Sequence, residues 1–190
     1  MDRRNFFATC GALGALLPTS VGAEQNGAAD GASQTAPIII QADQIPALSM
    51  GLGEARIVID TERSNGAWWL GHFREDAGFT TSLHLHPVQD EQFYVLDGVL
   101  SIFLGGAWKD LTAGAYASVP RGTPHAQAAG GRGSVTFMGG GNPAGFERYF
   151  PALAELAKNL KPSDPRWPAE VTKVVSRYDT TVLGPPPPRA

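Results

Sequence analysis

Short segments rich in β-branched and aromatic residues follow one another closely from residue 38 to residue 138. Glycine, proline, asparagine and aspartate lie between them, as in Asn65-Gly66 and Asp97-Gly98. Many short strands with turn residues between them are typical of an all-β sandwich or barrel. The pattern predicts strands at 38–40, 55–61, 67–74, 79–86, 91–96, 99–104, 115–119, 125–129 and 134–138.

One helix is predicted after the strands, over residues 146–159. Apolar residues recur there near helical spacing, at Phe146, Phe150, Leu153, Leu156 and Leu160. Asn142-Pro143 precedes the segment and favours a helix start. We expect this helix to flank or cap the strands.

Residues 161–190 form a proline-rich tail that ends in four consecutive prolines after Gly184. Such a run favours polyproline II and excludes a central strand. The tail is either a ligand for a proline-binding module or a stiff or disordered terminus, and we favour the second interpretation.

The first 23 residues are interpreted as a signal peptide. Arg3-Arg4 precedes an apolar run that reaches Leu17, and Val21-Gly22-Ala23 offers a small-residue cleavage site. Arg3-Arg4-Asn5-Phe6-Phe7 resembles a twin-arginine leader. The apolar run falls short of the roughly 20 residues that span a bilayer. We therefore expect an exported protein, periplasmic or extracellular, instead of an anchored one.

Residues 24–36 are mostly Gly, Ala, Ser, Gln and Asn and predict a flexible spacer, followed by one globular domain over 37–160. The only cysteine, Cys10, lies in the leader, so the mature chain offers neither disulfides nor thiolate ligands. The formal net charge of −3, without basic runs, argues against nucleic acid as a partner. No segment after Ala23 is long and apolar enough for membrane insertion once the leader is removed.

Three of the four histidines fall in a pattern that suits a metal ion. His84 and His86 project from one face of a strand, because side chains alternate with a period of two. Glu91 and His125, arriving from other strands, would complete a set of three nitrogens and one oxygen around a divalent metal. The fourth histidine, His72, is expected to have a structural or pocket-rim role.

The same alternation predicts which side chains line a pocket. If His84 points inward, so does Ser82; Glu91 brings Phe93 and Val95 with it, and Gln127 shares a face with His125. The full predicted pocket is Ser82, Phe93, Val95, Phe103, Gln127 and Phe137. An aromatic-lined cavity beside a metal suits a small aromatic or hydrophobic ligand better than a free sugar, although each aromatic taken singly fits a plain core equally well. The outward Leu83 and Leu85 predict cover by a sheet, by the amino-terminal strands or by a second subunit.

Two spaced motifs resemble those of the cupin superfamily. The first contains Gly78, His84, His86, Glu91 and Gly98, and the second contains Gly114, Pro120, Gly122 and His125. The short interval 99–113 between them is typical of small single-domain bacterial cupins. The resemblance implies a double-stranded β-helix, which is a jelly-roll-like barrel, holding a metal by the four residues named above. It also implies a homodimer. Ala129 stands where the second motif usually has asparagine, and Gln127 is a candidate for the missing polar contact.

The segment 143–150 resembles the one that follows the barrel in quercetin 2,3-dioxygenase-like cupins. The resemblance implies a metal-dependent dioxygenase that acts with dioxygen on a small aromatic, flavonol-like or enolic substrate. Glu91 would be both a metal ligand and the catalytic base. The ligand set does not choose among Fe, Mn, Ni, Cu and Zn. Two alternatives stay open: a non-oxidative cupin isomerase or lyase, and a non-catalytic protein that binds a small molecule.

Overall fold

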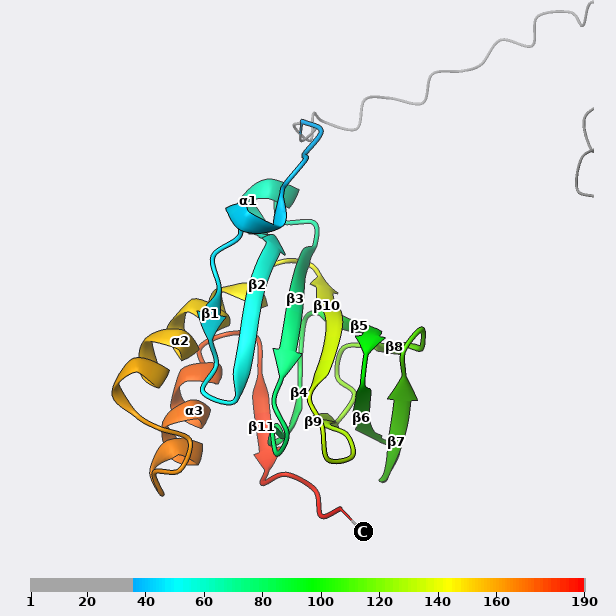
Figure 1. Ribbon diagram of the computed structural model, residues 1–190, viewed down its shortest axis with the longest axis vertical. Coiled ribbons are helices and arrows are strands. Elements are labelled where there is room, and N and C mark those ends of the chain that lie inside the picture. The colour runs from blue at the N-terminus through cyan, green and yellow to red at the C-terminus, as the bar shows by residue number, and fades with distance from the viewer. Residues whose placement is uncertain (1–35, 190) are drawn as a thin grey trace, which may run out of the picture. The chain divides into compact units, whose positions relative to one another are not determined.

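The computed structural model describes residues 36–189. The expected leader at 1–23, Cys10 and the spacer up to residue 35 lie outside the described residues. Two antiparallel sheets face each other in the described part of the chain (Figure 1). Among residues 36–189, no helix combines the length and the apolar character needed to cross a bilayer.

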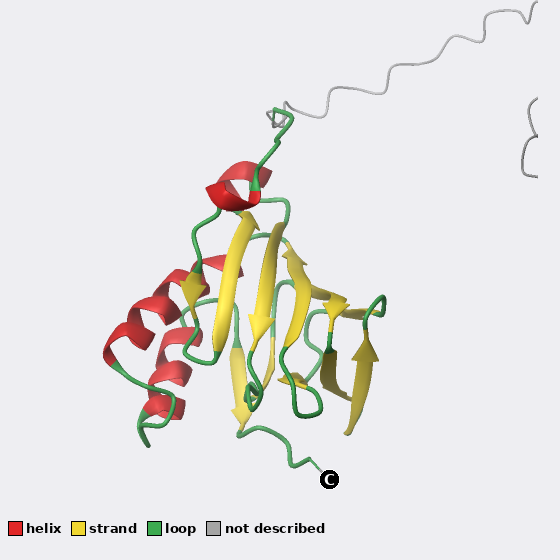
Figure 2. Ribbon diagram, in the orientation of Figure 1, coloured by secondary structure: helices red, strands yellow, loops and turns green. Residues whose placement is uncertain are grey.

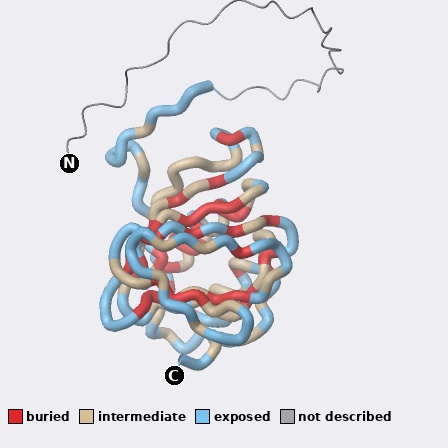
Figure 3. The backbone as a smooth tube through the Cα atoms, turned by 90° about the vertical axis from the view of Figure 1, so that its right-hand side faces the viewer, coloured by how far each residue is buried: buried red, intermediate tan, exposed pale blue. Residues whose placement is uncertain are grey.

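The first sheet has six strands. Their order is β1 (Leu48–Ser49), β2 (Gly53–Ile59), β3 (Trp69–Glu75), β10 (Val135–Asn142), β5 (Asp90–Asp97) and β8 (Tyr116–Val119). Along β5, buried and exposed residues alternate, so Glu91, Phe93 and Val95 face the interior as the sequence predicted. Figure 3 colours the described backbone by burial, with buried, intermediate and exposed stretches following one another along the chain.

The second sheet has five strands and carries two of the four histidines, His84 and His125. Its order is β11 (Thr181–Gly184), β4 (Leu83–Leu85), β9 (His125–Ala129), β6 (Val99–Leu104) and β7 (Ala107–Thr112). His84 of β4 lies directly opposite His125 of β9 in the antiparallel register. Two of the histidines that the sequence separates by more than forty residues are therefore neighbours across one strand pair.

Short helical segments complete the fold (Figure 2). They are η1 (Ala42–Gln44), α1 (Thr61–Ser64), η2 (Phe146–Arg148), α2 (Tyr149–Asn159) and α3 (Trp167–Val175). The helix predicted at 146–159 is confirmed by η2 and α2. α2 packs against α3 and β1, so the two helices flank one end of the paired sheets (Figure 1).

A cluster of aromatic rings joins the first sheet to η2 and α2. Phe73 stacks on Phe137, with 5.2 Å between ring centroids, and lies 4.9 Å from Phe150. Trp69 lies 5.9 Å from Phe146 and 5.7 Å from Phe150. Aromatic side chains bury large apolar areas and dominate core energetics. This cluster therefore fixes the position of the helical flank relative to the sheet.

Several sequence predictions of secondary structure were wrong or incomplete. The segment 38–40 forms no strand, because Ile38 and Ile39 are exposed and have no partner strand. The strand predicted at 79–86 is regular only over Leu83–Leu85, preceded by an isolated bridge between Thr80 and Ala128. The edge strand β7 was missed because its mixture of polar and apolar residues is mostly exposed.

The expectation of a tail without regular structure is wrong for 167–184. α3 was not predicted, and β11 pairs with β4, where Val182 lies opposite His84. The prolines that follow adopt no regular structure, but the Pro188 carbonyl accepts a hydrogen bond from Trp108 Nε1 at 3.1 Å. Arg189 also donates to Ser101 Oγ at 2.7 Å. The C-terminal segment is thus an integral part of the second sheet.

Glu147 ties the helical flank to the first sheet's loops. Its side chain is buried and accepts hydrogen bonds from the Thr61 backbone N–H at 2.9 Å and the Gly145 N–H at 2.6 Å. The Thr61 hydroxyl donates to the same carboxylate. Removing the acceptor from a buried hydrogen-bond network leaves the donors without partners, which destabilises the folded protein.

We therefore expect Glu147→Ala to lower the free energy of unfolding by about 3 kcal/mol. Glu155→Ala is the matched control, since Glu155 is an exposed residue of α2 that pairs only with Lys158. That control is expected to change stability by less than about 0.5 kcal/mol. Urea denaturation of both variants measures the difference. Equal stability of the two would show that the Glu147 contacts contribute little.

Candidate metal centre

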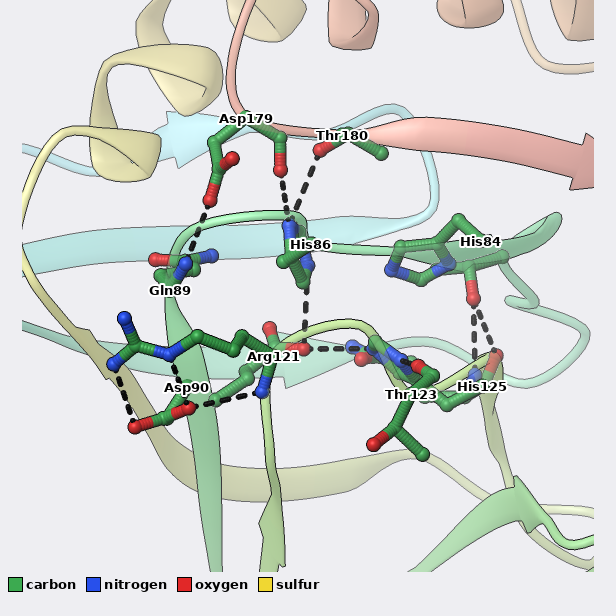
Figure 4. Close-up of polar contacts among 12 residues, drawn as sticks. His84, His86, Gln89, Asp90, Arg121, Thr123, His125, Asp179 and Thr180 are labelled. Atoms are coloured by element: carbon green, nitrogen blue, oxygen red, sulfur yellow. Dashed lines mark hydrogen bonds and ion pairs between the residues drawn. The ribbon is translucent and has the colours of Figure 1, made fainter.

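Four buried side chains converge between the two sheets. His84, His86, Glu91 and His125 each offer a ligand atom, and these atoms all lie within 4.8 Å of one another. His86 and His125 are only 2% and 1% exposed. The structure therefore brings together all four residues that the sequence predicted as metal ligands. Figure 4 shows the three histidines among them.

A backbone carbonyl fixes each imidazole ring through its Nδ1 atom. His84 Nδ1 lies 2.8 Å from the Ser82 oxygen, and His125 Nδ1 lies 2.9 Å from the Thr123 oxygen. His86 Nδ1 lies 2.7 Å from the Asp179 oxygen. A carbonyl oxygen only accepts hydrogen bonds, so each Nδ1 must carry the proton. In a neutral ring the lone pair then resides on Nε2.

The Nε2 atoms lie beside a carboxylate that cannot satisfy them. Glu91 Oε2 is 2.9 Å from His125 Nε2 and 3.4 Å from His86 Nε2. The buried His86 Nε2 has no hydrogen-bond partner. Lone pairs facing an anionic oxygen repel each other unless a cation lies among them. Three imidazole nitrogens and one carboxylate oxygen are ordinary ligands of a divalent transition metal, so the residues fit such an ion.

Without a metal, protons must supply the positive charge. Burial raises the pKa of Glu91, but the charge of His86 and the hydrogen bond from His125 outweigh it and hold that pKa well below its usual range. Burial lowers the pKa of His86, whereas the Glu91 carboxylate raises it by more. Burial and the neighbouring His125 lower the pKa of His84 to about 4. Glu91 is therefore anionic, and the His84 ring is neutral near pH 7.

Contacts outside the cluster hold the ligand strands in place. Arg121 makes two side-chain hydrogen bonds to Asp90, of 3.0 and 2.9 Å, and its backbone N–H donates to the same carboxylate (Figure 4). These bonds join the turn before His125 to the start of β5. They also lower the pKa of Asp90 to about 2. The turn itself is anchored by the Gly122 N–H, which donates to the His86 carbonyl at 2.8 Å.

Asp179 supports the cluster from the C-terminal segment. Besides the carbonyl that binds His86, its carboxylate accepts hydrogen bonds from the Val88 N–H at 3.1 Å and the Gln89 N–H at 2.9 Å. The loop between β4 and β5, which separates His86 from Glu91, is thereby held to the residues before β11. No sequence motif pointed to Asp179, because the tail containing it resembled a terminus without structure.

A mainly apolar cavity of about 310 Å³ borders the cluster. His84 and Glu91 line it, together with the aromatic rings of Phe93, Phe137 and Phe146. Residues of α3 and the segment before it, among them Pro162 and Trp167, line it as well. One wall therefore carries the candidate ligands, and most of the remainder is hydrocarbon.

Four of the six residues predicted for the pocket line this cavity. Ser82, Phe93, Gln127 and Phe137 line the cavity. Val95 is fully buried but does not reach the cavity. Phe103 does not line the cavity. It alternates with Ile102, which faces the interior, and its ring lies 5.6 Å from Trp108 on the outer side of the sheet.

Two other positions complete the comparison with the sequence. His72, expected to have a structural or pocket-rim role, alternates with the buried Phe73 on β3 and does not line the cavity, so of these two roles the structural one stays a prediction. Gln127, the candidate for the polar contact that Ala129 lacks, donates a hydrogen bond from Nε2 to Glu75 Oε1 at 2.7 Å. Glu75 itself was missed, although alternation from Trp69 and Phe73 places it on the inner face.

Comparisons with known proteins agree with this geometry. The family model described as cupin domain matches residues 71–138. No curated protein matches the chain. Among solved structures, KdgF from Halomonas sp. is similar with a TM-score of 0.53 and 18% identity, over 60% of this chain and 99% of that one.

Two further structures are similar at a TM-score of 0.50. The polyketide cyclase RemF from Streptomyces resistomycificus is 22% identical over 56% of this chain and 80% of its own. An RmlC-like cupin from Shewanella frigidimarina is 20% identical over 58% of this chain and 95% of its own. At these identities the neighbours establish the fold. The two motifs, the double-stranded β-helix and the cupin-domain match over residues 71–138 together support a small single-domain cupin.

Proposed function

We propose that the protein is a metal-dependent enzyme, and specifically a dioxygenase, that acts on a small aromatic, flavonol-like or enolic substrate. The observation that carries this proposal is the position of the four-residue cluster on the wall of an apolar cavity. Four protein ligands leave one or two coordination places open on a divalent metal. The cavity offers the space beside those places for an organic molecule.

The residues of the cluster and of the cavity have different roles in the proposed reaction. A redox-capable metal in the cluster would supply a Lewis acid for an enol or phenol oxygen and a route for electrons to dioxygen. The three imidazoles would hold it through Nε2. Glu91 is the anionic member of the set and lines the cavity, so it is placed to accept the proton of a substrate hydroxyl. Phe93 and Phe137 exclude water and favour a flat, apolar substrate.

One observation favours a non-oxidative isomerase, lyase or cyclase as the second candidate. Glu75 places another carboxyl group in the same cavity as Glu91. Two carboxyl groups that line one cavity can move a proton between two substrate positions without any oxidant. A passive binding protein is the third candidate, but it has no need of a complete set of metal ligands.

Two further proposals, export and self-association, rest on the sequence alone. We propose that the leader directs the protein out of the cytoplasm and that the mature chain forms a homodimer.

Metal binding is tested first, by elemental analysis of the purified protein. We expect about one equivalent of a divalent transition metal in the wild type and at least a tenfold lower content in His86→Ala. His72→Ala is the matched control, because it removes the one histidine outside the cluster and should leave the metal content unchanged. Equal metal in all three proteins would place the ion elsewhere.

The support given by Asp179 is tested by its own substitution. Asp179→Ala removes the carboxylate that holds the Val88 and Gln89 N–H groups, so the loop carrying His86 loses its anchor. We expect metal affinity to fall roughly 10- to 100-fold, as when other supporting partners of a metal ligand are lost. Asp179→Asn keeps one acceptor oxygen and should lose less. Competition with a chromogenic chelator measures both, and wild-type affinity in Asp179→Ala would refute the anchoring role.

The type of reaction is tested by oxygen dependence. With flavonols, catechols and enols as substrates, we expect oxygen uptake that matches substrate loss and disappears under argon or after the metal is removed. An oxygen electrode and product analysis measure this directly. Turnover that continues unchanged under argon would replace the dioxygenase with the non-oxidative candidate.

A further inference from the structure

Glu75 is a buried carboxyl group on the cavity wall. It is the last residue of β3, and alternation places it on the inner face with Trp69 and Phe73. The residue is 1% exposed and lines the same cavity as His84 and Glu91. Glutamate is almost never fully buried unless it is paired with a cation or a metal. In the described residues, Glu75 forms no ion pair.

Among the described residues, the one hydrogen-bond partner of the Glu75 side chain comes from the opposite sheet. Gln127 of β9 reaches across the interior and donates from Nε2 to Glu75 Oε1 at 2.7 Å. The second oxygen, Oε2, is buried and has no hydrogen-bond partner. Burial raises the pKa of Glu75 to about 8; the Gln127 hydrogen bond lowers it, and the negative charge of Glu91 raises it further. The group is therefore protonated near pH 7.

The position of Gln127 also decides which oxygen carries that proton. Oε1 already accepts the amide N–H, so the proton belongs on Oε2, where it forms an O–H donor without an acceptor. A buried polar group without a partner costs about 1–3 kcal/mol, and native proteins retain few of them. A core-facing apolar residue at position 75 would avoid this cost. An acceptor supplied by a ligand in the cavity explains why the carboxyl group is there.

We propose that Glu75 and Gln127 form a second polar recognition point in the cavity, which binds an oxygen atom of an otherwise apolar substrate. This inference rests on the proposed function in taking the cavity as the substrate site. Glu91 and His84 meet one end of the molecule, and Glu75 meets another. The substrate class is thus a compact aromatic or other apolar molecule with two oxygen functions on separate edges, instead of a simple phenol with one.

Two probe molecules that differ by one hydroxyl group test the proposal. 2-Naphthol has one oxygen, and 2,6-dihydroxynaphthalene has a second at the far edge of the ring system. Affinities of the protein as purified are measured by calorimetry at pH 6.5. One added hydrogen bond is expected to make the diol bind roughly three- to tenfold more tightly to the wild type.

The variants separate recognition from a purely structural role. Glu75→Met, which keeps the length of the side chain without a polar atom, should bind both probes equally. Glu75→Gln still presents a donor and should retain most of the preference for the diol. Glu54→Met is the matched control, because Glu54 lies on the neighbouring strand and pairs with Arg56 outside the cavity. If Glu75→Met does not fold, Gln127→Leu carries the test, since Glu75 then loses the contact that orients it.

The proposal is overturned if the wild type binds both probes equally, if it binds neither, or if Glu75→Met keeps the preference. Metal content is measured on the same samples. A wild type without metal that still prefers the diol would refute the proposed function and leave the recognition point. A wild type with metal and no preference would refute the recognition point alone.

Discussion

The direction of three imidazole rings depends on three backbone carbonyl groups. The Ser82, Thr123 and Asp179 oxygens accept from the Nδ1–H of His84, His125 and His86, which leaves every Nε2 lone pair directed at the same small volume. Each carbonyl belongs to a different segment of the chain. The register of β4 with β9, the turn at 120–122 and the docking of the C-terminal segment are all needed for the cluster to form.

The cavity gives that cluster its chemical setting. Two members of the cluster, His84 and Glu91, border the cavity beside the phenyl rings of Phe93, Phe137 and Phe146, which carry no polar group. Burial disfavours the charged form of an ionisable group, which is why the pKa of Glu75 is raised and that of His84 is lowered. α2 and α3 add to this burial, because Phe150 and Trp167 line the cavity on the helical side.

Much of the site could be predicted from the sequence because it is recorded in local spacing. His84 and His86 share a face through strand alternation, and β5 alternates regularly enough to place Glu91 and Phe93 inward. The motifs supplied the pairing of these strands with His125. The pocket position predicted for Phe103 failed because alternation identifies the two faces of a strand. It does not say which face is interior unless the orientation of one residue on that strand is known. Val95 faces inward as predicted, but only the packed structure shows how far the cavity extends.

The C-terminal contribution could not be predicted in this way. Asp179 and β11 act through pairing with residues about ninety positions earlier, and such a contact leaves no period in the sequence. The prolines after Gly184 further suggested a terminus without structure. Glu75 is the intermediate case: alternation from Phe73 would have placed it inside, but its unusual protonation follows only from burial and from Gln127 on the opposite sheet.

X-ray absorption spectroscopy of the purified protein tests whether the three imidazoles and Glu91 bind a metal. We expect a metal whose nearest scatterers are nitrogen and oxygen at about 2.0–2.2 Å, with outer scattering from about three imidazole rings. A sulfur shell, the absence of imidazole scattering, or a protein that holds no metal after loading would contradict this expectation.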